Sequence, residues 1–285
     1  MNASTSLIAV QGHIEEAGAI VWWRLEGGLN HADLTEAWKS AGLNEDLLPN
    51  TSTLDDCLRR AVTTHQRKRY RARPTEVGWA LVEEVVTEGR DDLTFRTDLK
   101  LRIEGEQVVC EPAAHPLASQ IAAEFGYLRS ELSAVACGSW LVSLVRSLQA
   151  VPLRDGGGVY FIPRHHLDAW RTMLGVVRKV SAHVVSEVRA LRSEEALAAI
   201  TDAINRDAEA HFEKVSEEIQ KHMTGEVTLG ERAVETRQQR LRELSTKLET
   251  YEQLLGTRLE TLRGRMEQIV GALALGHLAT AGSFQ

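Results

Sequence analysis

The sequence predicts an α+β fold in which a mixed N-terminal region precedes a long helical tail. All six prolines lie at or before residue 163, so residues 164–285 lack the residue that most strongly breaks helices. That tail is rich in Ala, Leu, Glu and Arg, which favour helix. By contrast, residues 94–103 alternate between apolar and polar side chains, as a half-buried strand does. We therefore expect a small antiparallel sheet first and an antiparallel helical hairpin or bundle after it.

The composition is that of an ordinary soluble protein of one to three domains. The chain has 285 residues, of which 43% are hydrophobic and 26% charged. A net charge of -7 excludes a generally basic surface but leaves room for a local basic patch. The three cysteines lack CxxC spacing, and we find no signal-peptide pattern, which favours a cytoplasmic protein. We also find no apolar run of 18 residues, which disfavours a membrane-spanning helix.

The first region, residues 1–112, is predicted to be mixed. Its expected elements are a strand over 19–25, helices over 34–41 and 54–64, a strand or helix over 78–86, a strand over 94–103 and a strand over 107–110 that pairs back on it. Thr53, followed by Asp55 and Asp56, is a suitable start for the second helix.

Residues 113–163 have the element order of a winged-helix unit. A helix is expected after Pro116, and a second helix over 134–148 with Ser133 as its cap. Two short strands, 151–154 and 159–162, then flank an Asp-Gly-Gly-Gly turn. We therefore predict a winged-helix-like unit here, which can serve either DNA contact or docking.

The tail, residues 164–285, shows three helical stripes. The first is Trp170, Leu174, Val177, Val180, Val184, Val188 and Leu191, and the second runs from Leu197 to Met223 behind the cap Ser193. A turn between Gly225 and Gly230 precedes the third, which we call the tail stripe. It consists of Leu241, Leu244, Leu248, Tyr251, Leu255, Leu259, Leu262, Met266, Ile269 and Leu273.

The tail stripe resembles a coiled-coil seam with a discontinuity between Leu255 and Leu259. At about 1.5 Å per residue its helix could reach about 60 Å, more than the second helix can cover. Two interpretations stay open, and they do not exclude each other. The stripe either packs in a three-helix bundle within one subunit or forms the interface of a homo-oligomer.

A basic cluster is the strongest candidate for binding chemistry. Residues 65–74 read HQRKRYRARP and contain Arg67, Lys68, Arg69, Tyr70, Arg71 and Arg73. Such a cluster attracts phosphates, and a tyrosine in it can stack on a base. Arg146 and Arg154, from the predicted winged-helix unit, would extend a nucleic-acid interface. The alternative is a solvated helix end, or a patch that pairs with acidic residues of the chain.

Motifs for catalysis or metal binding are lacking. The sequence has no HExxH, no GxSxG and no run of Cys and His at metal-ligand spacing. Gly156–Gly158 leads into a strand rather than a helix, which indicates a hairpin turn rather than a phosphate loop. We therefore predict no catalytic residue, no metal and no cofactor, and an enzyme ranks only third among the functions considered.

Several short segments together resemble an uncharacterised family of phage and bacterial mobile-element proteins. They are residues 48–51 (LPNT), 58–62 (LRRAV), 78–82 (GWALV), 157–163 (GGVYFIP), and Tyr251 with 254–256 (LLG). The resemblance implies a phage- or plasmid-associated context and carries no site residues. The leading hypothesis is a non-enzymatic assembly protein that self-associates through its tail and holds an unidentified protein partner with its head. The alternative is a nucleic-acid-binding protein.

Overall fold

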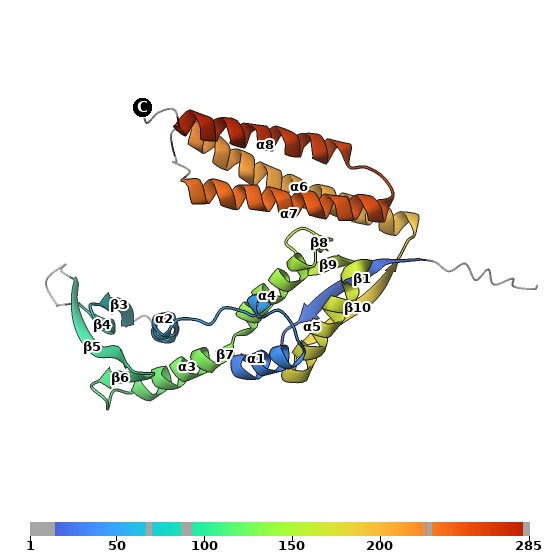
Figure 1. Cartoon of the computed structure of the whole chain (residues 1–285). Coiled ribbons are helices and arrows are strands. Elements are labelled where there is room, and N and C mark those ends of the chain that lie inside the picture. Colours follow the sequence, from blue (N-terminus) through green and yellow to red (C-terminus); the bar gives the residue numbers. More distant parts are fainter. Residues whose placement is uncertain (1–14, 67–69, 87–92, 225, 227–229, 282–285) are drawn as a thin grey trace, which may run out of the picture. The chain divides into compact units, whose positions relative to one another are not determined.

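The computed structural model describes residues 15–66, 70–86, 93–224, 226 and 230–281 (Figure 1). The chain forms two units, each built from separate segments. The bundle unit comprises the chain up to Arg24, Ser143–Arg171 and the chain from Val185 onward, and the sheet unit comprises Leu25–Val142 and Thr172–Val184. This division differs from the continuous one at residues 112 and 163, because the first strand pairs with one near residue 160.

The sheet unit contains a four-stranded antiparallel sheet of order β3-β4-β5-β6. Its elements are β2 (Leu29–Asn30), α1 (His31–Ser40), a 3-10 turn (Glu45–Leu47), α2 (Leu54–Thr64), β3 (Tyr70–Thr75), β4 (Gly78–Val86), β5 (Leu93–Glu104), β6 (Gln107–Glu111), α3 (Ala118–Ser130), β7 (Glu131–Leu132), and parts of α4 (Ala134–Ser147) and α5 (Leu167–Val180). Helices α2 and α3 pack together and cover one face of the sheet, where Leu81, Leu99 and Ile121 are fully buried.

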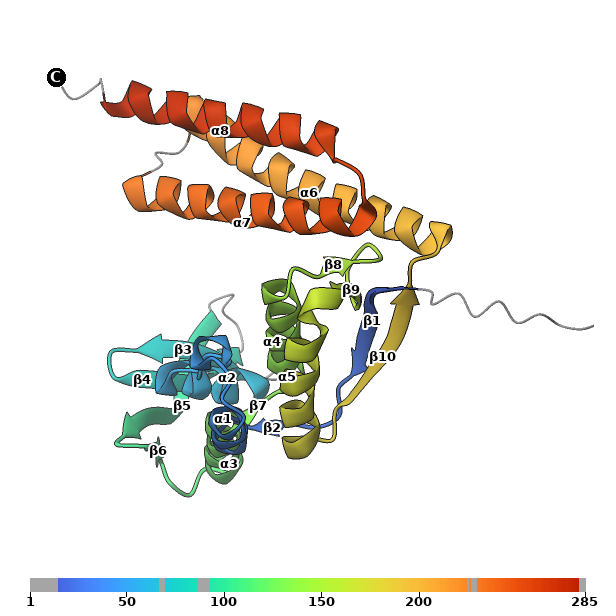
Figure 2. The same ribbon diagram turned by 45° about the vertical axis from the view of Figure 1, so that its right-hand side comes forward.

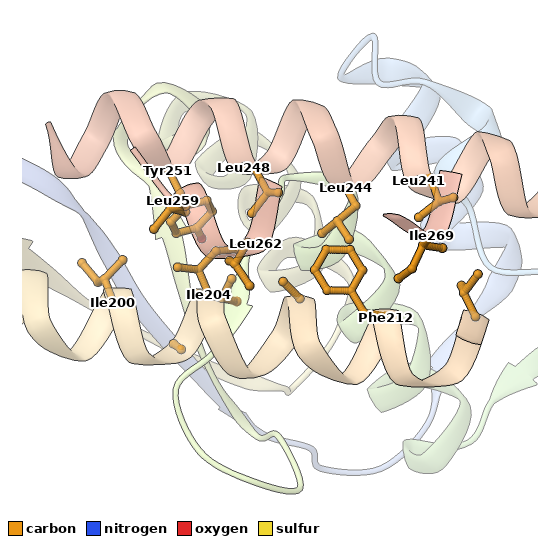
Figure 3. Close-up of a cluster of buried hydrophobic side chains, with 14 of the residues drawn as sticks. Ile200, Ile204, Phe212, Leu241, Leu244, Leu248, Tyr251, Leu259, Leu262 and Ile269 are labelled. Atoms are coloured by element: carbon orange, nitrogen blue, oxygen red, sulfur yellow. The ribbon is translucent and has the colours of Figure 1, made fainter. Parts of the chain in front are cut away.

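The bundle unit joins a second sheet, of order β10-β1-β9-β8, to three long helices (Figure 2). Its elements are β1 (Glu16–Arg24), β8 (Val151–Pro152), β9 (Val159–Pro163), a 3-10 turn (Arg164–His166), β10 (Val184–Leu191), α6 (Glu194–Met223), α7 (Glu231–Leu255) and α8 (Glu260–Ala281). Figure 3 shows side chains of the three helices pointing toward one another around Phe212, which is fully buried.

The α+β class and the helical tail are confirmed, and several element boundaries agree closely. Helix α2 spans the predicted residues, and the Thr53 side chain accepts a hydrogen bond from the Asp56 backbone N–H. Ser193 likewise caps α6 by accepting from the Ala196 backbone N–H. In both cases a side-chain oxygen satisfies an N–H group that has no partner inside the helix, as the sequence pattern indicated.

The tail stripe does not lie on the one continuous helix of about 60 Å that the sequence predicted, but on two helices, α7 and α8. Helix α7 ends at Gly256, whose φ of 69° places it in the left-handed region, and α8 folds back as a separate helix. Glu252 holds the corner: its carboxylate accepts from the Leu259 backbone N–H at 3.0 Å and from the Arg263 guanidinium at 2.7 Å. The discontinuity in the tail stripe therefore marks a turn, because glycine adopts this conformation without steric cost.

The first tail stripe is also interrupted. Helix α5 ends at Val180, and residues 184–191 form strand β10, which lies next to β1. Val184, Val188 and Leu191, predicted to lie on the buried stripe, are 44%, 51% and 42% exposed. The reason is that β-branched residues favour strand, and spacing of three and four does not distinguish the two structures over so short a run.

The predicted winged-helix unit does not form as one module. Its elements occur in the expected order, but α3 packs on α2 and β6 in the sheet unit. Strands β8 and β9 instead extend the sheet of the bundle unit, where β9 pairs antiparallel with β1 from Gly18 to Trp22. Because β9 pairs with β1, the β8–β9 hairpin belongs to the sheet of the bundle unit and not to a module with α3. Among the described residues, no helix is both long and apolar enough to cross a membrane.

Candidate nucleic-acid interface

The sheet β3–β6 carries cations on the face opposite α2 and α3. Side chains alternate across a strand, so Tyr70 and Ala72 of β3 lie on the helix-covered core while Arg71 and Arg73 lie on the other side. The register places Arg73 opposite Ala80, Ala80 opposite Lys100, and Gly78 opposite Arg102. We call the surface formed by Arg71, Arg73, Phe95, Lys100 and Arg102 the cationic face.

Two strands supply the charge, and the strand between them supplies small side chains. Arg71 and Arg73 belong to β3, and Lys100 and Arg102 to β5. Between them, Gly78, Ala80 and Val82 of β4 lie on the same face, where Ala80 and Val82 are buried beneath the longer side chains of the neighbouring strands. Two strand spacings separate β3 from β5, which is about 10 Å. An extended polyanion lying along β4 would therefore have cations on both sides.

The cations of this face differ in whether their side chains already form ion pairs within the protein. Arg102 forms ion pairs with Glu104 at 2.7 Å and with Glu111 at 3.5 Å, and the Glu104 hydrogen bond raises the pKa of Arg102. The Arg73 guanidinium lies 5.6 Å from the centroid of the Phe95 ring. The side chain of Lys100 makes no hydrogen bond or ion pair with the described part of the chain. Arg73 and Lys100 are thus the cations best placed to take a phosphate.

Phe95 reaches the cationic face because of a β-bulge. Leu81 pairs with Leu99 but Val82 pairs with Thr97, so Asp98 is an extra residue in β5. The alternation therefore reverses at Asp98: Leu99 and Leu101 are buried on the core, whereas Phe95 is 52% exposed. Strict alternation over residues 94–103, as the sequence pattern suggested, would place Phe95 on the same buried face as Leu99. That expectation was wrong, because a bulge is invisible to strict alternation.

Tyr70 does not lie on the cationic face, which corrects its predicted role as a stacking residue. Its ring packs edge-on against His115 on the core side of the sheet, with centroids 6.1 Å apart. Asp98 lies in the same group, with His115 Nε2 3.0 Å from its Oδ2. Hydrogen bonds from His115 and then Tyr70 lower the pKa of Asp98. Tyr70 is thus engaged in fixing the bulge, and Phe95 is the aromatic residue on the open side.

The rest of the predicted interface is divided. Arg67, Lys68 and Arg69 lie outside the described residues. Arg146 and Arg154 belong to the bundle unit, and the Arg154 guanidinium donates to the Gly157 carbonyl inside the β8–β9 turn. The predicted combination of the basic cluster with the hairpin therefore involves residues of two different units. Lys100 and Arg102 were missed, although they occupy the polar positions of the alternating 94–103 segment.

The tail stripe lies inside the chain's own bundle, so a second chain is not needed to bury it. Eight of its residues are among the buried core of the bundle unit, and Leu255 and Met266 pack against that core. Of the two interpretations that the sequence left open, the structure shows the three-helix bundle within one subunit. The fold-back at Gly256 is the physical reason, since it places α8 against α6 and α7.

The described residues offer little for metal or thiol chemistry. No group of three or more His, Cys, Asp or Glu side chains among them could hold a metal ion. Burial raises the pKa of all three cysteines, that of Cys137 to about 12, so the reactive thiolate is disfavoured.

One comparison with known proteins yields a match. The model of a family described as "Family of unknown function (DUF6744)" matches residues 17–281. No curated protein and no solved structure matches the chain.

Proposed function

The chain belongs to this family of unknown function, and from its own residues we propose that it binds single-stranded nucleic acid through the cationic face. The observation that carries the proposal is the arrangement of Arg73, Lys100 and exposed Phe95 on one side of an antiparallel sheet. Cations bind the phosphates, and an exposed aromatic ring stacks on a base whatever its identity. A macromolecular partner of the head is thus proposed to be nucleic acid rather than protein.

Charge supports contact at short range only. The whole chain carries a net charge of -7, so attraction at long distance is weak and the cationic face must act locally. Each phosphate contact still releases counterions, which makes binding fall steeply with salt. A role on nucleic acid is compatible with the phage or mobile-element context that the sequence resemblance implies.

Replacing Arg73 and Lys100 together by Ala is expected to weaken binding to a single-stranded oligonucleotide. For single strands each lost phosphate contact lowers the salt slope by about 0.7, so the double variant should lose about 1.4 in slope and about tenfold or more in affinity at ~0.1 M salt. Fluorescence anisotropy across a salt series measures both quantities. Phe95→Ala should lower affinity with little change in slope, because stacking involves no counterion.

The matched control removes the same charge elsewhere. Arg232 and Arg258 are exposed residues of the bundle unit, and their double Ala variant should keep the wild-type slope. If the wild type does not bind, or if both double variants behave alike, the cationic face is not the interface.

Self-association is a second candidate, through a groove that the tail helices α7 and α8 form. This groove has a volume of about 360 Å³. Its lining residues are Leu241, Met266 and Leu273 of the tail stripe, Val270, and the polar residues Gln238, Arg242 and Ser245. Val270 is 49% exposed. A second copy of the chain could cover this apolar strip. Val270→Glu should then shift the molar mass measured by light scattering from oligomer to monomer. A wild-type protein that remains a monomer at all concentrations would exclude this candidate.

A further inference from the structure

A pocket in the bundle unit is separate from the cationic face and belongs to no function described above. Its volume is about 550 Å³, within the range of small-molecule sites. Its lining residues come from three helices. They include Arg146 at the end of α4 and Gln149 just after it, Asp207 and His211 of α6, and Arg240 and Lys247 of α7. Helix α4 and the consecutive helices α6 and α7 thus bring four basic side chains together.

The base of the pocket is a buried ion pair. Lys247 Nζ donates to Asp207 Oδ2 at 2.7 Å and to the Ala150 carbonyl at 2.8 Å, and the two charged side chains are only 12% and 14% exposed. Tyr251, from the next turn of α7, donates its hydroxyl to the Gln149 carbonyl at 3.0 Å. These contacts hold the α4–β8 connection against α7, and they use the charge of Lys247 within the protein.

The rim of the pocket, by contrast, carries arginine side chains that lack ion-pair partners in the described part of the chain. Arg146 and Arg240 are exposed, and neither forms a hydrogen bond or ion pair through its side chain with any residue that the structure describes. The rim also holds Glu243, whose carboxylate accepts from the Gln239 side-chain amide at 3.0 Å. Two arginines without anionic partners therefore face one carboxylate that is already hydrogen-bonded.

Gln149 adds an independent sign of a binding site. Its φ is 58°, the left-handed region that residues other than glycine seldom adopt. Its Oε1 atom is buried and has no hydrogen-bond partner in the structure. A strained backbone and a buried acceptor without a donor both cost free energy, and such features concentrate where a ligand is held. Here both occur in one residue of the pocket wall.

We infer that this pocket binds a small phosphate monoester of nucleotide size. Arg146 and Arg240 would donate charge-assisted hydrogen bonds to the phosphate oxygens. Gln149 Oε1 would accept a hydrogen bond from an O–H or N–H group elsewhere on the same molecule. A sugar phosphate and a nucleoside monophosphate share this chemistry, so the two are compared directly in the test.

The test is isothermal titration calorimetry on the full chain at constant ionic strength, with adenosine monophosphate, ribose 5-phosphate and adenosine as probes. At least one of the phosphate-bearing probes should bind saturably, and adenosine should bind about tenfold or more weakly. Tighter binding of adenosine monophosphate than of ribose 5-phosphate identifies a nucleotide site, and the reverse order a sugar-phosphate site.

Variants locate the binding. Arg146→Gln and Arg240→Gln should each weaken the phosphate-bearing probe about tenfold, since each removes one charged donor. Arg242→Gln takes one charge from the same helix outside the pocket and should leave affinity unchanged. The inference is overturned if neither phosphate compound binds, if adenosine binds equally well, or if Arg242→Gln and Arg240→Gln have equal effects. The Arg73/Lys100 double variant should bind the probe normally, which separates this site from the proposed nucleic-acid interface.

Discussion

Replacing Asp207 by Leu is expected to destabilise the bundle unit by about 3–5 kcal/mol at neutral pH. Lys247 would lose the carboxylate 2.7 Å from its ammonium group and keep only the Ala150 carbonyl as a partner. A buried charge without a counter-ion costs far more than the pair contributes, because its hydration has been given up without compensation. Urea unfolding, followed by circular dichroism, measures the loss as a lower transition midpoint.

The double variant Asp207→Leu/Lys247→Met is the control. It replaces the pair by apolar side chains, and most of the stability should return, since an apolar pair of similar volume is often as stable as a buried ion pair. If the double variant is as unstable as Asp207→Leu alone, the loss comes from packing and not from the unpaired charge.

The pH dependence provides a second check on the same pair. Burial lowers the pKa of Lys247, so between that lowered value and the ordinary lysine pKa of about 10.5 the unfolded chain binds more protons than the folded one. This group therefore makes stability rise with pH through that window. Burial raises the pKa of Tyr251 above 10.0, so Tyr251 makes stability fall as the pH rises beyond that value. Lys247→Met should remove the first component and leave the second.

Local signals predicted much of the secondary structure. The capping residues Thr53 and Ser193 and the glycine turns act on neighbouring residues, so their effect can be deduced from the sequence alone. The proline-free tail was likewise helical apart from β10. These features share one property: the atoms that interact lie within a few residues of one another.

Long-range pairing was not predictable in the same way. Strand β1 joins β9 across about 140 residues, and this contact removes the β8–β9 hairpin from α3 and hence from the expected winged helix. The tail stripe predicted which residues are buried but not which helices they pack against. An apolar stripe indicates only that its side chains need some surface to pack on. The fold-back at Gly256 decided which surface covers it.

The candidate site shows the same division. Arg71 and Arg73 were found from their charge, but their face of the sheet depends on β3 being a strand. The aromatic residue on the cationic face is Phe95 and not Tyr70. The bulge at Asp98 turns Phe95 toward that face, whereas Tyr70 packs against His115 on the core side of the sheet. The pocket with Arg146 and Arg240 combines α4, α6 and α7, and no pattern within a single segment could indicate it.

Gly18 provides the test of the long-range pairing, and Gly18→Ala should destabilise the bundle unit by about 3 kcal/mol. A Cβ atom there would overlap the backbone oxygen of Ile162 and lie 2.8 Å from two ring carbons of Phe161, which is fully buried. Neither group can give way easily, because the oxygen belongs to the adjacent strand and the ring packs edge-on against Tyr251.

Gly264→Ala in α8 is the control. A Cβ atom there meets open space, so this variant should instead gain about 0.5–1 kcal/mol in stability, since alanine favours helix. Thermal and urea unfolding distinguish the two variants. Equal midpoints for Gly18→Ala and the wild type would mean that β1 does not lie against β9 in this register.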